Sequence, residues 1–192
     1  MNKDDYIMVS FATKDGKYDI FGKRWEKNMT DLNIPFDIEY IDPIKPSKHN
    51  ERLLSYKRQK KDAGRTRGKF LYNKLKQYNK TIIWMDCDDG FIEKPILPKD
   101  EYDVGFVDGE IKSLQIMARL LVLKPTENCY HFLNVWDYLN SWPELEPIGG
   151  SHLRLHFARY ICFKKNGKNP MGFKDKNLTD VFLPYLKIDM HR

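Results

Sequence analysis

Short apolar runs alternate with amphipathic segments through the first 85 residues of the chain. The runs at 6–12, 36–41 and 81–85 are rich in β-branched and aromatic residues and end in polar turn residues, so they predict strands. Apolar residues recur at helical spacing over about 20–33 and again on one face of 70–78. This strand, helix, strand, helix, strand order predicts an α/β fold with a mostly parallel sheet and helices on both of its faces.

The second half of the chain has a less regular pattern. It predicts strands at 102–107 and 114–123, helices at 126–139 and 151–160, and a short final strand within 183–191. Thr126 suits the N-cap of the first of these helices, and the acidic Glu127 beside it favours the same helix start. We therefore expect a small additional sheet in this half, within one domain that spans residues 1–192.

The composition is typical of a globular domain without a membrane span. The chain has 192 residues, 41% of them apolar, with 11 Phe and 11 Tyr to fill a core. No stretch approaches the roughly 18 consecutive apolar residues of a membrane helix, and residues 1–5 do not begin a signal peptide.

Cys87, Cys129 and Cys162 form no C-x-x-C pair, so no disulfide framework or cysteine zinc site is indicated. We expect a cytoplasmic protein.

Positive charge is concentrated in one part of the chain. The formal net charge is +6, and residues 45–80 alone carry thirteen Lys and Arg against Glu51 and Asp62. Two interpretations remain open, a solvated helix surface that keeps the protein soluble, or an electrostatic funnel for a partner that bears phosphate. The charge alone does not distinguish a nucleotide from a nucleic acid.

Three carboxylates follow the third predicted strand. Asp86, Asp88 and Asp89 lie within four residues at its carboxyl end, which is the edge where open parallel sheets bind ligands. Alternation along an extended chain puts Asp86 and Asp88 on the same side, roughly 6–7 Å apart. Two such oxygen donors suit Mg²⁺ or Mn²⁺, which proteins bind through one or two carboxylates together with substrate phosphates. A polar turn that only ends the strand is the simpler alternative.

The sequence around these aspartates resembles one group of enzymes. Lys69 precedes a predicted helix that ends in a tyrosine and a lysine, and the strand after that helix leads into Asp86-Cys87-Asp88. This arrangement resembles glycosyltransferases of the GT-A fold, in particular the glycogenin-like family 8. The resemblance implies a GT-A-like sheet and a metal-dependent enzyme that moves a sugar from a nucleotide-sugar to an acceptor hydroxyl. Sugar transferases of large algal viruses are similar, which would place the protein in a host cell and in viral glycan synthesis.

Further segments match this family in the same order. The stretch 119–126 is similar to the family's strand and helix start after the metal motif, and the strand 9–13 is similar to its uridine-binding strand. Residues 149–152 lie where the family has Gly-Gly-Asp-Gln. The chain departs from the family at 117–119, where Met-Ala-Arg replaces Asn-Ser-Gly, and at 151–152, where Ser-His replaces Asp-Gln. The family's residues for retaining chemistry are therefore missing.

The resemblance also assigns roles to individual residues. It implies that Asp88 binds Mn²⁺ or Mg²⁺ directly, that Asp86 bridges the metal and the ribose, and that His191 completes the metal site. Lys69, together with Arg67, is expected to hold the diphosphate. The residues expected to bind the nucleotide-sugar, a UDP-sugar, are Ser10, Phe11, Ala12, Thr13, Tyr18, Arg67, Lys69, Asp86, Cys87 and Asp88. Residues 1–90 would form the nucleotide-binding half of the domain and residues 91–192 the acceptor-side half.

An inverting reaction would need a general base for the acceptor hydroxyl. Asp108 and Glu110 follow the strand that ends at Val107, and His152 lies at a predicted helix start. Asp108 and His152 are the two leading candidates. Each also has a purely structural interpretation, because Asp108-Gly109 suits a turn and a histidine in the first turn of a helix often makes only a local hydrogen bond.

Two other functions remain open. Phosphatases of the haloacid-dehalogenase type also carry D-x-D after a buried strand, but their motif lies on an early strand and continues with Gly-Thr, whereas here Asp89-Gly90-Phe91 follows. A nucleic-acid-binding module could use the basic segment 45–80, with aromatic residues such as Tyr56 and Tyr72 for stacking. That function leaves the three aspartates unexplained.

Overall fold

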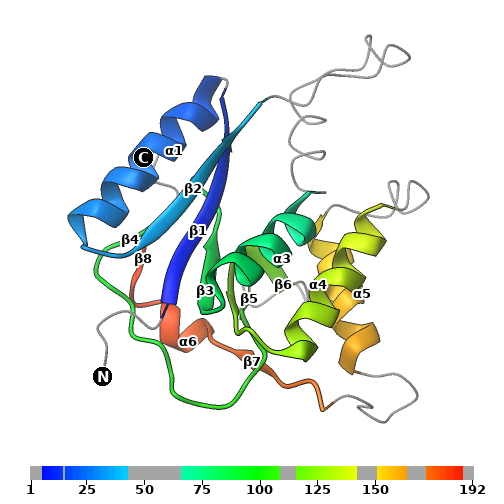
Figure 1. Ribbon diagram of the computed structural model, residues 1–192. Helices are drawn as coiled ribbons and strands as arrows, with labels where there is room; N and C mark the ends of the chain where they lie inside the picture. The colour runs from blue at the N-terminus through cyan, green and yellow to red at the C-terminus, as the bar shows by residue number, and fades with distance from the viewer. Residues whose placement is uncertain are drawn as a thin grey trace, which may run out of the picture.

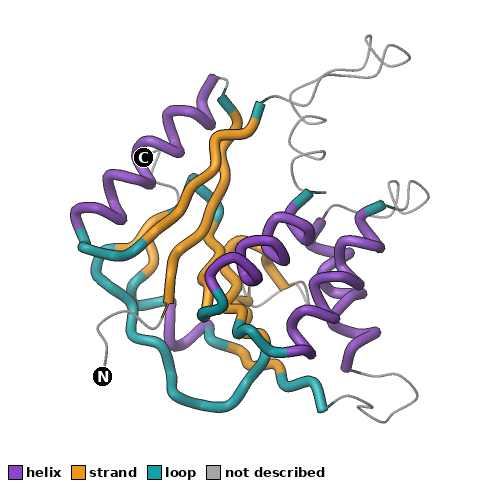
Figure 2. The backbone as a smooth tube through the Cα atoms, in the orientation of Figure 1, coloured by secondary structure: helices purple, strands orange, loops and turns teal. Residues whose placement is uncertain are grey.

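The computed structural model describes residues 6–14, 16–42, 66–108, 116–141, 151–163 and 172–187. Their strands are β1 (Tyr6–Thr13), β2 (Phe36–Ile41), β3 (Thr81–Met85), β4 (Gly90–Phe91), β5 (Val104–Asp108), β6 (Ile116–Leu123), β7 (Asp175–Asn177) and β8 (Leu186–Lys187). The helices are α1 (Gly16–Asp31), α3 (Arg67–Tyr78), α4 (Glu127–Asn140), α5 (Ser151–Phe163) and α6 (Thr179–Phe182). Figure 1 labels these elements, and Figure 2 separates helices, strands and loops by colour.

Six strands of the described chain form the central sheet, in the order β2-β1-β3-β6-β5-β7. Strands β1, β2 and β3 pair in parallel, and β5 and β7 also pair in parallel. Strand β6 is antiparallel to both of its neighbours, β3 and β5, and so runs against the other five. The sheet is therefore mostly parallel, as the sequence predicts.

Helices cover both faces of this sheet and bury one hydrophobic cluster on each. On one face, Phe21, Trp25 and Met29 of α1 pack against alternate residues of β1 and β3, with Phe182 of α6 in the same cluster. On the other face, residues of α3, α4 and α5 pack against the remaining residues of the same strands. Figure 1 shows α1 on one side of the sheet and these three helices on the other. The three-layer arrangement confirms the predicted α/β class.

The structure also locates the ends of the predicted elements. Strands β2 and β3 have the predicted bounds, and α4 begins after Thr126, whose side chain accepts a hydrogen bond from the Cys129 main-chain N–H. Strand β5 begins two residues later than predicted. Strand β6 is described from Ile116, and its predicted start at 114 lies outside the described residues. Within the described residues the additional sheet consists of β4 paired antiparallel with β8, and the rest of the predicted final strand, 188–191, lies outside them. Strand β7 and helix α6 were not predicted, because three- and four-residue elements leave no periodicity to detect.

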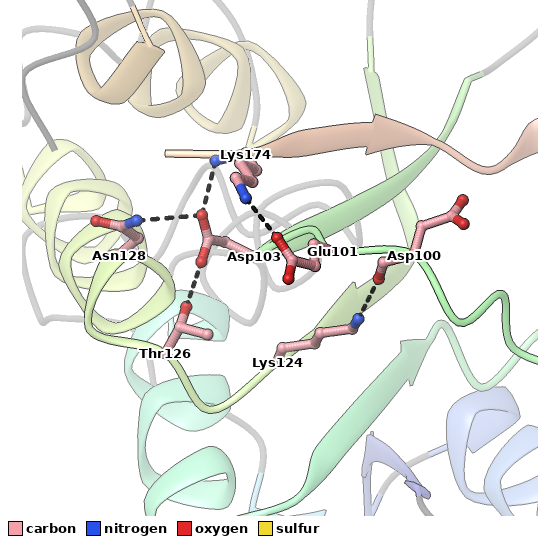
Figure 3. A network of polar contacts seen from close by, with 7 residues as sticks. All are labelled: Asp100, Glu101, Asp103, Lys124, Thr126, Asn128 and Lys174. Carbon is pink, nitrogen blue, oxygen red and sulfur yellow. Dashed lines mark hydrogen bonds and ion pairs between the residues drawn. The ribbon is translucent and has the colours of Figure 1, made fainter. Parts of the chain in front are cut away.

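A buried carboxylate connects three segments at one end of the sheet. Asp103, just before β5, accepts hydrogen bonds from the Thr126 hydroxyl at 2.6 Å, the Asn128 side-chain amide at 3.2 Å and the Lys174 main-chain N–H at 2.6 Å. Figure 3 shows these contacts, which join the start of α4 to the segment before β7. The Asp103 main chain adds hydrogen bonds to Lys124 and Lys174. This network fixes β5 and β7 relative to α4.

Among the described helices, none combines the length and the apolar character that crossing a membrane requires.

Candidate functional site

The turn that carries the three aspartates lies at a switch point of the sheet. From β1 the chain passes to β2 on one side, and it later returns to β3 on the other side of β1. The carboxyl ends of β1 and β3 therefore flank the position where open α/β sheets bind ligands. Asp86 follows β3 directly, and the Asp89 main-chain N–H donates to the Asp86 carbonyl at 3.0 Å, which closes the turn.

Asp86 lies beside the first residue of α3. The Arg67 guanidinium approaches the Asp86 carboxylate to 2.9 Å, and its carbon lies 4.8 Å from the centre of the Trp84 ring. Burial, together with the nearby carboxylates of Asp88 and Asp89, raises the pKa of Asp86 to about 6 against the opposing charge of Arg67. Negative charge on Asp86 is therefore costly in the protein alone, and a cation beside it would lower that cost.

Asp89 forms an ion pair with a different arginine, Arg119. Its two carboxylate oxygens accept hydrogen bonds from Nε and Nη2 of Arg119 on β6, the first at 2.8 Å. Burial opposes the charge of this guanidinium, but the hydrogen bonds and the charge of Asp89 outweigh burial and raise the pKa of Arg119. The Asp89 side chain is 5% exposed, so the carboxylate is enclosed by the protein. Asp89 is therefore not available as a metal ligand.

Asp88 differs from Asp86 and Asp89 in its contacts. Its side chain is half-buried, and within the described part of the chain it has no hydrogen-bond or ion-pair partner. The described residues contain no group of three or more His, Cys, Asp or Glu side chains that could hold a metal ion. Asp86 and Asp88 nevertheless offer oxygen donors of the kind that Mg²⁺ and Mn²⁺ prefer, and these ions commonly take their remaining ligands from substrate phosphates and water. The two aspartates fit a divalent cation of that type.

The predicted nucleotide-binding residues of β1 lie at different depths. Ser10 is fully buried and its hydroxyl donates to the Met85 carbonyl at 2.7 Å, which ties β1 to β3 at the switch point. Phe11 packs against Phe70 and Trp84 with ring centres 5.3 and 5.1 Å away, so its ring belongs to the core. Ala12 is buried on the opposite face.

Thr13 and Tyr18 lie nearer the surface, and both are half-buried. The Tyr18 ring contacts Phe21 edge-on at 5.7 Å. Cys87 is buried on the α1 side of the sheet, and this burial raises the pKa of its thiol. The thiol is therefore neutral, and a contact between Cys87 and a nucleotide would come from its main chain.

Helix α3 presents Arg67 and Lys69 in different directions. Arg67 is buried against Trp84 and Asp86, whereas Lys69 is exposed and its ammonium lies 5.5 Å from the centre of the Tyr72 ring. The Arg67 guanidinium is the cation that this helix brings to the aspartate turn. The predicted role of Lys69 in holding a diphosphate stays a prediction.

The predicted bases lie at the limits of the described structure. Asp108 ends β5, where its main chain pairs with Ile116, and His152 lies in the first turn of α5. The side chains of Asp108 and His152, and the whole of Glu110 and His191, lie outside the described residues. Their predicted roles in proton transfer and metal binding stay predictions.

Two features of the site were not expected from the sequence. Arg119 entered only through the comparison with the family, in the similar stretch 119–126 and in the departure at 117–119, and no ionic partner was predicted for it. Its position beside the apolar run 120–123 was the available signal, because a charged residue next to a buried run needs a partner. Asn28 of α1 is the second feature. Its amide donates to the Phe91 carbonyl and accepts from the Phe91 main-chain N–H, both at 2.9 Å, which fixes β4 just after the turn.

Comparison with known proteins identifies the fold of the chain. No protein-family model and no curated protein matches the chain. A glycosyltransferase involved in the glycosylation of the major capsid of PBCV-1 superimposes with a TM-score of 0.58 at 9% identity, over 96% of this chain and 92% of that one. The glycosyltransferase GlyE of Streptococcus pneumoniae TIGR4 gives 0.58 at 11% identity, over 93% of this chain and 46% of that one.

A third solved structure, the PaToxG glycosyltransferase, gives a TM-score of 0.50 at 12% identity, over 82% of this chain and 69% of that one. Such low identities establish the fold alone, since one fold hosts many activities. The chain has the fold of these glycosyltransferases, which confirms the GT-A-like architecture that the aspartate motif and the order of elements predict.

Proposed function

We propose that this protein is a glycosyltransferase that uses a divalent cation, Mn²⁺ or Mg²⁺, and a UDP-sugar donor. The observation that carries the proposal is the position of Asp86 and Asp88. They follow β3 directly, beside the switch point of a sheet whose overall fold matches that of glycosyltransferases. The acceptor would be a hydroxyl group, for example that of a glycan.

The charges around the turn suit the departure of a diphosphate. Breaking the bond between a sugar and a nucleoside diphosphate develops negative charge on the leaving phosphate, and cations stabilise that charge. A divalent ion on Asp88 and Asp86 would act as a Lewis acid toward the diphosphate. Arg67 lies against Asp86 and would contribute a second, permanent positive charge.

The remaining predicted residues complete the proposal. His191 would add a third ligand to the cation, and Lys69 would reach the diphosphate from the surface of α3. Either Asp108 or His152 would accept the proton of the acceptor hydroxyl if the reaction inverts the configuration of the sugar.

Calorimetric titration of UDP tests the donor site. We expect UDP to bind in the presence of Mn²⁺ and not in EDTA, and to bind more tightly than GDP. Asp88→Asn should abolish the metal-dependent binding without loss of fold, because the Asp88 side chain makes no ion pair or hydrogen bond in the described structure. Asp31→Asn is the matched control, since Asp31 ends α1 at the opposite edge of the sheet and pairs only with the exposed Lys27 among the described residues.

Release of UDP from a panel of UDP-sugars then measures transfer and hydrolysis. Binding of UDP that is equal with Mn²⁺ and with EDTA, or unaltered in Asp88→Asn, would contradict the metal site. If UDP does not bind at all, an oligonucleotide titration over a range of salt concentrations tests the nucleic-acid alternative, because phosphate contacts make affinity fall steeply with salt. Hydrolysis of a simple phosphate monoester with no transfer of sugar would instead favour the phosphatase alternative.

A further inference from the structure

The four residues of the aspartate turn contain three carboxylates that the structure treats differently. Asp86 pairs with Arg67 from α3, and Asp89 pairs with Arg119 from β6. Asp88 lies between them in the sequence and pairs with neither Arg67 nor Arg119. Each flanking carboxylate is thus anchored to a different layer of the fold, α3 on one side and β6 on the other.

Arg119 contacts both ends of the turn. Its main-chain carbonyl accepts a hydrogen bond from the Asp86 N–H at 2.9 Å, which continues the antiparallel pairing of Met85 with Leu120. Its guanidinium binds both carboxylate oxygens of Asp89, three residues further along. One residue of a buried strand therefore sets the distance between the start and the end of the turn, and Asp88 lies within that span.

We propose that Arg119 and Asp89 are positioning residues, which hold Asp86 and Asp88 in the geometry that a divalent cation with a bound diphosphate requires. This inference rests on the proposed function. Outer contacts that orient metal ligands change metal affinity by about 10- to 100-fold when they are removed. A bidentate arginine–carboxylate pair is suited to such a role because its two parallel hydrogen bonds fix orientation as well as distance.

If Arg119 and Asp89 acted only through their charges, the predicted effect on cation affinity would have the opposite sign for Arg119→Met. Asp89→Asn leaves the Arg119 charge without its counter-ion, so electrostatics weakens cation binding. Arg119→Met removes a positive charge close to the site, so electrostatics strengthens cation binding, whereas a loss of positioning weakens it. Arg119→Lys keeps the charge but cannot form the bidentate pair, so only the positioning role predicts a loss in that variant.

The experiment measures Mn²⁺ affinity in the presence of UDP by electron paramagnetic resonance of the unbound ion, together with thermal unfolding of each variant without metal. We expect Asp89→Asn, Arg119→Met and Arg119→Lys each to lower the affinity by about tenfold or more. The double variant Asp89→Asn/Arg119→Met should lose about as much as one single variant, because the same pair is broken once. If Arg119→Met does not fold, Asp89→Asn and Arg119→Lys decide the question.

Asp175→Asn is the matched control. Asp175 of β7 is also an aspartate in an ion pair with an arginine, Arg159 of α5, and its side chain is 10% exposed against 5% for Asp89. This control should lower stability and leave Mn²⁺ affinity unchanged. Wild-type affinity in Arg119→Lys, tighter binding in Arg119→Met, or losses in Asp175→Asn equal to those in Asp89→Asn would each overturn the inference. If the wild-type protein itself binds no Mn²⁺ with UDP, the proposed function fails and the inference fails with it.

Discussion

Replacement of Asp103 by alanine should be among the most destabilising single changes outside the hydrophobic core. The carboxylate is buried, with the residue 7% exposed, and accepts three hydrogen bonds from Thr126, Asn128 and Lys174 (Figure 3). Alanine removes all three acceptor contacts. It also leaves the main-chain N–H of Lys174 without the carboxylate it donates to, and an unmet donor at such a position costs more than the bond contributed.

The expected loss follows from these contacts. Hydrogen bonds to a charged group contribute about 1.5–3 kcal/mol each, and the two bonds of 2.6 Å lie toward the strong end of that range while the bond of 3.2 Å adds little. Because the contacts share one residue they are not additive, and we expect Asp103→Ala to lower the free energy of unfolding by about 3–5 kcal/mol. For a chain of this size the midpoint of thermal unfolding should fall by about 10 °C.

Asparagine at the same position should cost less, about 1–2 kcal/mol. Its oxygen can face Lys174, and its NH₂ group can donate to the Thr126 hydroxyl, which then acts as an acceptor. Thermal unfolding by circular dichroism measures both variants, with Glu101→Ala as control. Glu101 is two residues away and makes an exposed ion pair with Lys174, so its removal should leave the unfolding midpoint unchanged. An Asp103→Ala midpoint equal to that of Glu101→Ala would refute the reasoning.

Three further predictions concern the helices around the site. A Cβ at Gly68 would lie 2.9 Å from the Asp137 main-chain nitrogen, so Gly68→Ala should lower the free energy of unfolding by about 1–3 kcal/mol in denaturant titrations. Asn140 is buried and both of its amide atoms lack a hydrogen-bond partner in the described structure, so Asn140→Leu should raise thermal stability by about 1–2 kcal/mol; a decrease would contradict this. Arg67→Met should weaken UDP binding by calorimetry more than uridine binding, because it removes the charge beside Asp86, and equal losses would argue against that role.

Hydrophobic periodicity was sufficient to predict most of the fold. Strands β1 and β3 are short apolar runs with clear turn residues after them, and their burial on both faces explains why those runs are nearly continuous. Strand β2 is a partly exposed edge strand, and its apolar residues alternate with Asp37 and Glu39. The antiparallel direction of β6 could not be predicted, because strand direction depends on long-range pairing that leaves no local pattern. The pairing of β4 with β8 was missed for the same reason, since two-residue strands are specified by their partner.

Helical geometry accounts for the placement of the two basic residues at the start of α3. With 3.6 residues per turn, Leu71 lies about 40° around the helix from Arg67, whereas Lys69 lies about 200° around it. Arg67 therefore shares the buried face with Leu71 and Leu75, and Lys69 is on the exposed face. The sequence already contained the helical spacing that separates Arg67 from Lys69. The resemblance to family 8 nevertheless favoured Lys69 as the main residue for binding the diphosphate.

The partner of Asp89 could not be predicted in the same way. Arg119 is thirty residues further along the chain, and it reaches Asp89 only because β6 lies antiparallel beside β3 in one register, with Leu120 opposite Met85. A shift of that register by one residue would turn Arg119 to the other face of the sheet. Individual contacts of this kind depend on tertiary structure, while the presence of three aspartates at a strand end depends only on local sequence.

The energetic cost of the aspartate turn argues that it serves a purpose other than stability. Two arginines and two aspartates are brought together at least partly out of water, and replacing such buried pairs by apolar residues is often neutral or stabilising. Burial also raises the pKa of Asp86 to about 6, so the fold does not favour the charge of the residue that it places beside Arg67. Asp88 is left between these pairs as a carboxylate that makes no ion pair or hydrogen bond within the described chain. A turn selected only to end a strand would need none of these charges. A turn that binds a cation together with a diphosphate needs anchored carboxylates and a permanent positive charge nearby. It also needs one carboxylate that no ion pair within the protein already occupies.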